Sequence, residues 1–199
     1  MIEPLRATLE RHPAVRSARL AGSRGRGGQL TPLSDWDIVV DTDDFAAVAA
    51  DLPVLSSVLR PLAQQWDPYA SEACYMLMLR GAVKVDVIFP DVPHESAPPW
   101  EARPDNLEAI NLHFWDWILW LASKQLRRDQ VERVEDQFEL MSRNLLRPLG
   151  VPEAPGSIEA AVAAYVAARD ELERRFDMVV SRAVEEEVLG ALGRAGFPV

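Results

Sequence analysis

The chain has 199 residues, and its 31 acidic and 21 basic side chains give a formal net charge of −10 at pH 7. This balance argues against a nucleic-acid coat protein or a membrane-surface protein, because both need a basic face to meet phosphate groups. The single cysteine excludes a disulfide framework within the chain, the first residues lack the apolar stretch of a signal peptide, and no apolar window is long enough to span a bilayer. We therefore expect a soluble, cytoplasmic protein with neither a membrane nor a nucleic acid as its partner.

The N-terminal half alternates between helical and strand patterns. A short helix is expected over residues 3–12, a strand over 15–22, a second strand over 35–41, and a helix over 43–52 with Asp43 or Thr42 as its cap. Residues 53–70 favour only a helical turn and a loop. Residues 72–90 predict two strands joined in a hairpin at Arg80–Gly81.

The C-terminal half is helical in pattern. Five prolines make residues 90–105 a connector, and apolar residues at helical spacing follow from 106 to 128 and again from 130 to 150. Ser157 is expected to cap a helix over 157–176, with another helix reaching about 194 and no Gly or Pro to separate the two. We expect an α+β domain over 1–92, with a mixed sheet, and an all-α helical bundle over 105–199.

Three aspartates stand out in the predicted strands of the first domain. Residues two apart on a strand share a face, so Asp35 and Asp37 project together while Trp36 and Ile38 face the other way. Asp86 is a lone acid within the apolar segment "AVKVDVIF". Closely held carboxylates repel one another unless a cation lies between them, and their oxygens suit Mg²⁺. The pattern predicts a metal site of Asp35, Asp37 and Asp86.

The turn "LAGSRGRGG" precedes these strands and is rich in glycine and arginine. A strand that ends at glycine and opens into a helix exposes backbone N–H groups that favour anions, and the Ser23 hydroxyl adds a donor. Arg24 and Arg26 stand where they could neutralise phosphate charge. Gly22 and the neighbouring glycines let the backbone approach a ligand closely. The turn therefore predicts a phosphate-binding loop.

The ordered set Gly22–Ser23, then Ser34-Asp35-Trp36-Asp37, then Val85-Asp86-Val87 resembles the signature of the nucleotidyltransferase superfamily that includes DNA polymerase beta. The portion "LTPLSDWD" is similar to the streptomycin-type aminoglycoside adenylyltransferases, and the short chain is also similar to minimal nucleotidyltransferases. The motif match covers roughly residues 15–90, and beyond it the resemblance rests on architecture. It implies the mixed-sheet nucleotidyltransferase fold.

The resemblance also implies the chemistry. A nucleoside monophosphate would pass from an NTP, most simply ATP, to a hydroxyl of an unidentified small-molecule acceptor, with release of pyrophosphate. Asp35 and Asp37 would bind two Mg²⁺ ions, or Mn²⁺, and Asp86 would bind the ion that activates the acceptor. Gly22 and Ser23 would hold the terminal phosphates. In related enzymes a basic residue of the helical domain reaches the triphosphate, and Lys124 is the candidate here.

Each of these features has a plainer interpretation. Asp35 and Asp37 could mark a solvated strand end, Asp86 could pair with Lys84 or an arginine, and Lys124 could be an ordinary cationic helix end. The tryptophans at 115, 117 and 120 could form the bundle core, the face of a homodimer or the wall of an acceptor pocket. Two other functions also stay open, an antitoxin-type nucleotidyltransferase that binds or modifies a partner protein and a non-catalytic nucleotide sensor.

Overall fold

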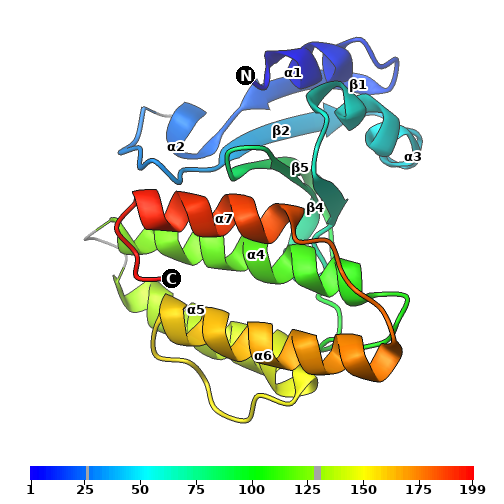
Figure 1. Cartoon of the computed structure of the whole chain (residues 1–199). Helices are drawn as coiled ribbons and strands as arrows, with labels where there is room; N and C mark the ends of the chain where they lie inside the picture. The colour runs from blue at the N-terminus through cyan, green and yellow to red at the C-terminus, as the bar shows by residue number, and fades with distance from the viewer. Residues whose placement is uncertain (26, 128–130) are drawn as a thin grey trace. The chain divides into compact units, whose positions relative to one another are not determined.

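The structure is a computed structural model, and it describes residues 1–25, 27–127 and 131–199. The chain divides into two compact units, which we describe separately (Figure 1). The first comprises Met1–Leu30 and Ser34–Ala97, and the second comprises Thr31–Leu33 and Pro98–Val199. We predicted domains at 1–92 and 105–199. Residues 31–33 lie within the first predicted domain, but in the structure they group with the second unit.

The first unit is built on a five-stranded mixed sheet in the order β1-β2-β5-β4-β3. Strand β2 runs parallel to β5, whereas the other neighbouring pairs are antiparallel. The elements are α1 (Glu3–Glu10), β1 (Val15–Leu20), α2 (Gly22–Gly25), β2 (Trp36–Thr42), α3 (Phe45–Ser56), a 3₁₀ turn (Ser57–Leu59), β3 (Ala63–Trp66), β4 (Glu72–Leu79) and β5 (Val83–Pro93). The mixed α+β class expected from the sequence is therefore present.

One face of this sheet holds the apolar core, and α1 and α3 pack against it (Figure 1). Period-two alternation sends every second side chain of a strand to this face, as the pattern predicts. The core is formed by apolar side chains from both helices and from the strands, among them Leu5, Leu9, Val48, Leu52, Ile38, Val40, Val85, Val87 and Phe89. The side chains between them, Asp37 and Asp86 included, therefore point to the opposite face.

Local structure departs from the sequence expectation between the second and fourth strands. The N-cap of α3 is Asp44, whose side chain accepts a hydrogen bond from the Ala47 N–H, so the expected caps Asp43 and Thr42 are wrong. The helix continues through Pro53 to Ser56, past the expected end at 52. Strand β3 was not expected. It has only four residues, and none of them is fully buried, so it lacks a clear pattern of alternating apolar residues. By contrast, the hairpin at Arg80–Gly81 is confirmed, with Gly81 at φ +80°.

The described part of the second unit is helical. Its elements are α4 (Leu107–Gln125), α5 (Val131–Met141), a π-helical segment (Ser142–Leu146), a 3₁₀ turn (Arg147–Leu149), α6 (Ile158–Phe176) and α7 (Ala183–Arg194). Ser157 caps α6 as expected. Asp177 ends that helix in the left-handed conformation, at φ 53°, and thereby separates α6 from α7 without a glycine. Among the described residues, none of the helices has the length and apolar character needed to cross a membrane.

Buried polar contacts order the interior of this unit. The rings of Phe114 and Tyr165 stack at 3.8 Å between centroids. The Asn111 side-chain oxygen accepts hydrogen bonds from the Trp115 indole and from the Tyr165 hydroxyl. Both aromatic side chains are fully buried, so each needs such a partner for its polar atom. Burial raises the pKa of Tyr165 and keeps its hydroxyl a donor.

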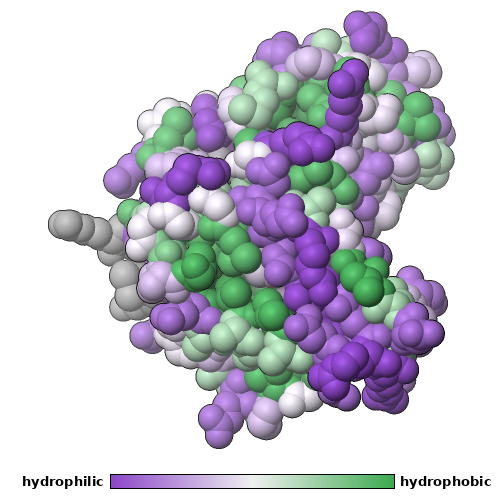
Figure 2. Space-filling view, in the orientation of Figure 1, coloured by the Kyte–Doolittle hydropathy of each residue, from purple (hydrophilic) through white to green (hydrophobic). Residues whose placement is uncertain are grey.

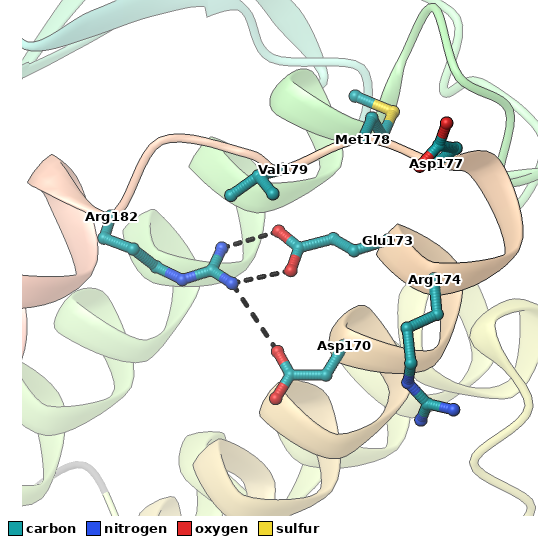
Figure 3. A pocket seen from close by; sticks show the side chains of 7 residues that line it. All are labelled: Asp170, Glu173, Arg174, Asp177, Met178, Val179 and Arg182. Atoms are coloured by element: carbon teal, nitrogen blue, oxygen red, sulfur yellow. Dashed lines mark hydrogen bonds and ion pairs between the residues drawn. The ribbon is translucent and has the colours of Figure 1, made fainter.

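An ion-pair network connects the C-terminal end of α6 to the start of α7 (Figure 3). Arg182 donates two hydrogen bonds of 2.7 Å to the carboxylate of Glu173, and the Val180 N–H also donates to this carboxylate. The Arg182 hydrogen bonds hold the pKa of Glu173 below its ordinary value of 4.5, with burial acting against them. Figure 2 shows hydrophilic side chains over this end of α6. In the pocket that Figure 3 shows, the charges of Asp170, Glu173 and Arg182 are therefore paired with one another.

We expect Glu173→Gln to lower the free energy of unfolding by about 1 to 2 kcal/mol at pH 7, because a charge-assisted hydrogen bond becomes a neutral one. The folded-state pKa of Glu173 is depressed, so its stabilisation is complete above pH 4.5 and is lost as the pH falls through the lower, folded-state value. Urea titrations between pH 7 and pH 3 should show the difference between wild type and variant shrinking below pH 4.5. Glu171→Gln is the matched control, because the Glu171–Arg174 pair is exposed and should contribute little.

Candidate functional site

The pairing of β2 with β5 places two of the predicted ligands side by side. The strands are parallel, and Asp37 is directly opposite Asp86 in the register. Neighbouring strands lie about 4.8 Å apart, and residues at matched positions point to the same face. The carboxylates therefore meet on the face of the sheet opposite α1 and α3.

Asp35 completes the cluster from the residue that precedes β2. It lies two positions before Asp37 and so projects to the same side. One carboxylate oxygen from each of Asp35, Asp37 and Asp86 lies within 4.8 Å of the other two. The structure thus brings together the three side chains that the sequence pattern predicted would converge. Their roles as ligands and catalytic groups stay predictions.

Lys84 is also part of this cluster. Its Nζ lies 3.2 Å from Oδ2 of Asp86, and only 8% and 11% of the two side chains are exposed. Lysine and aspartate are two positions apart on β5, so both point away from the core. The sequence left open whether Asp86 joins the metal site or pairs with Lys84. In the structure its carboxylate lies in the aspartate cluster and also beside Lys84.

Gly22 is fitted against Asp37 at the end of β1. Leu20 pairs with Ile38, and the Ala21 N–H donates to the Asp37 carbonyl at 2.9 Å, so the chain turns beside the Asp37 side chain. Gly22 has φ +58°, and a Cβ there would lie 1.6 Å from Oδ2 of Asp37. The sequence suggested that this glycine makes room for a ligand. In the structure it makes room for a carboxylate of the site itself.

Arg24 makes contacts that its position in the turn did not suggest. Its guanidinium donates to the carbonyls of Ser34 and Asp35, at 3.0 Å each, and lies 4.0 Å from the centre of the Trp36 ring. These contacts clasp the backbone that carries Asp35 into β2. Arg24 therefore fixes the position of a predicted ligand. Phosphate binding by this residue stays a prediction.

The structure bears unequally on the three remaining predicted residues. Ser23 is half-buried in α2, a helix of only four residues, and its carbonyl accepts from the Gly28 N–H at 2.8 Å. Arg26 lies outside the described residues. Lys124 belongs to the helical unit, in the last turn of α4, with Nζ 4.9 Å from the centre of the Trp120 ring. Its proposed contact with a triphosphate stays a prediction.

The donor set fits a hard divalent cation. Two unit charges 4.8 Å apart repel by about 3.5 kcal/mol at an effective dielectric constant of about 20, and the cluster holds three such pairs. On the same scale the attraction between Lys84 and Asp86 at 3.2 Å is about 5 kcal/mol, which is about half of the summed repulsion. The surplus of negative charge and the oxygen ligands are what Mg²⁺ or Mn²⁺ requires.

Comparisons with known proteins add little to this geometry. No model of a protein family matches the chain, and no curated protein matches it. Solved structures similar to it include a crystal structure of an aminoglycoside 6-adenyltransferase from Bacillus subtilis, at 9% identity and a TM-score of 0.38. The alignment covers 98% of this chain and 97% of that chain. A likeness at this level carries no functional argument, so the side chains must supply it.

We expect Gly22→Ala to damage the site by displacing the Asp37 carboxylate. Gly27→Ala is the matched control, because Gly27 also has a positive φ, of 67°, yet nothing lies within 4 Å of the position that an alanine methyl group would occupy there. Both variants carry the backbone penalty of about 1 to 2 kcal/mol for alanine in this conformation. Urea denaturation should show a further loss of at least about 1 kcal/mol for Gly22→Ala alone. Equal losses would mean that Asp37 moves aside without cost.

Proposed function

We propose that the chain is a Mg²⁺-dependent nucleotidyltransferase, with ATP as the expected donor and a small hydroxylated molecule as the acceptor. The observation that supports it is the convergence of Asp35, Asp37 and Asp86 from two adjacent strands, beside the Gly22–Ser23 turn. An acidic cluster alone would suit many metal enzymes. The Gly22–Ser23 turn beside these carboxylates, with its backbone N–H groups and the Ser23 hydroxyl as donors, is the feature that favours a substrate with a polyphosphate tail.

The resemblance to nucleotidyltransferases suggests a role for each of these side chains. Asp35 and Asp37 would each offer oxygens to two ions, and Asp86 would hold the ion nearer the acceptor. Bound Mg²⁺ would neutralise charge on the triphosphate and make the acceptor hydroxyl more acidic. Ser23 would donate its hydroxyl hydrogen to a terminal phosphate oxygen. Arg24 would keep Asp35 in place through its backbone carbonyl.

The reaction is a substitution at the α-phosphorus. The acceptor oxygen forms a bond to that phosphorus, the bond between it and the bridging oxygen of pyrophosphate breaks, and the electron pair leaves with pyrophosphate. The hydroxyl proton passes to a carboxylate, for which Asp86 is the candidate, and then to water. Catalysis of this kind depends on positioning and charge, and the described cluster would supply both.

We expect wild-type protein with ATP and Mg²⁺ to release pyrophosphate when a suitable acceptor is present, in a panel of hydroxylated small molecules that includes aminoglycosides. Asp35→Asn, Asp37→Asn and Asp86→Asn should each lower kcat by about 100-fold or more, because each removes charge that the transition state needs. Mass spectrometry of the acceptor should show the added nucleoside monophosphate.

The matched control is Asp41→Asn. Asp41 lies on the same strand as Asp37, but its carboxylate accepts a hydrogen bond from Ser17 and does not belong to the cluster. Its variant should retain wild-type activity. Calorimetry with a non-hydrolysable ATP analogue provides a test without an acceptor. Binding that is independent of Mg²⁺ and unchanged in Asp37→Asn would refute the proposal.

A further inference from the structure

Lys84 is a buried cation in direct contact with a predicted metal ligand. Both Lys84 and Asp86 are more than nine-tenths buried as residues, at 7% and 8% exposure, and their charged atoms lie 3.2 Å apart. Burying an ammonium group is costly unless a charge of opposite sign compensates it. An apolar residue would serve this strand position better if packing were its only requirement.

We propose that Lys84 is the built-in counter-ion of the carboxylate cluster and sets its affinity for divalent cations, an inference that rests on the proposed function. Three negative charges and one positive charge leave Asp35, Asp37, Asp86 and Lys84 with a formal charge of −2. One divalent cation balances this charge. Without Lys84 the same carboxylates would hold a charge of −3 and bind the cation more tightly.

The strand geometry explains why this residue can act in this way. Lys84 and Asp86 alternate with the core residues Val85 and Val87 and with Val83, which packs against the core, so both must emerge on the carboxylate face. The lysine ammonium is a compact point charge, and it contacts Oδ2 of Asp86 without the two-oxygen grip that an arginine would make. A cation that approaches Asp86 therefore competes with a charge fixed on the same strand.

Removing a counter-ion should change the metal affinity in the opposite direction to removing one partner of a structural ion pair. If Lys84 only supported the fold, its removal would disturb Asp86 and weaken metal binding. As a counter-ion, its removal leaves three carboxylates whose repulsion only a bound metal relieves. The metal-free protein then becomes less stable, while its affinity for the metal increases.

The test is a titration of the full chain with Mn²⁺ alone, followed by electron paramagnetic resonance of the free ion and by calorimetry. Lys84→Gln and Lys84→Met should each bind Mn²⁺ about tenfold more tightly than wild type, because a unit charge a few ångströms away is removed. Lys84→Arg retains the charge and should not bind Mn²⁺ more tightly than wild type. Thermal unfolding should show a larger Mn²⁺-induced rise in Tm for the two neutral variants, and this measurement also serves a variant that is unstable without metal.

Two controls separate the possible failures. Arg16→Gln removes a cation that is 54% exposed and pairs with Asp43 near the other end of β2, so it should leave Mn²⁺ binding unchanged. If Asp37→Asn weakens Mn²⁺ binding but the neutral Lys84 variants bind with wild-type or lower affinity, the counter-ion inference is overturned and the metal site stands. If wild type and Asp37→Asn bind Mn²⁺ equally, the proposed metal site fails, and the counter-ion role fails with it.

Discussion

The parallel pairing of β2 with β5 is the constraint on which the candidate site depends. It sets Asp37 opposite Asp86, and the alternation of each strand sends both carboxylates to the face away from α1 and α3. A shift of one residue in this register would send one carboxylate into the apolar core, at a cost that the fold cannot offset. Burial of Ile38, Val85 and Val87 on one face therefore fixes the charges on the other.

The residues around the three aspartates support the cluster by steric fit, hydrogen bonds and electrostatic attraction. Gly22 leaves space for the Asp37 carboxylate that any side chain would fill, and Arg24 holds the Asp35 backbone by two carbonyls. Lys84 offsets part of the repulsion that the convergence creates. Each of the three acts on a different aspartate, so every member of the cluster has its own support within this unit.

The sequence predicted the hairpin, the acids of the candidate site and all strands of the sheet except β3. It did not predict how distant segments pair or how the loop residues contact them. Alternation and residue type predicted which acids share a face, and the hairpin at Arg80–Gly81 followed from turn chemistry. The parallel register of β2 and β5 joins distant segments, so no local pattern reports it. The clasp of Arg24 on Ser34 and Asp35 depends on the path of the loop between them, and α3 continues through Pro53 because tertiary packing outweighs helix propensity.

One face of the sheet carries the apolar core that stabilises the fold, and the other carries the carboxylates of the candidate site. This separation has a thermodynamic consequence. The core face gains free energy when apolar area is buried, whereas the carboxylate face loses free energy through like-charge repulsion. A cation that binds only the folded cluster would offset this repulsion. At a free concentration of 100 times its dissociation constant, it would add about 2.7 kcal/mol to the free energy of unfolding. In a domain whose total stability is about 5 to 15 kcal/mol, such a term is large. Occupancy of the site and persistence of the fold are therefore coupled, because the residues that would bind the metal are the ones whose repulsion opposes folding.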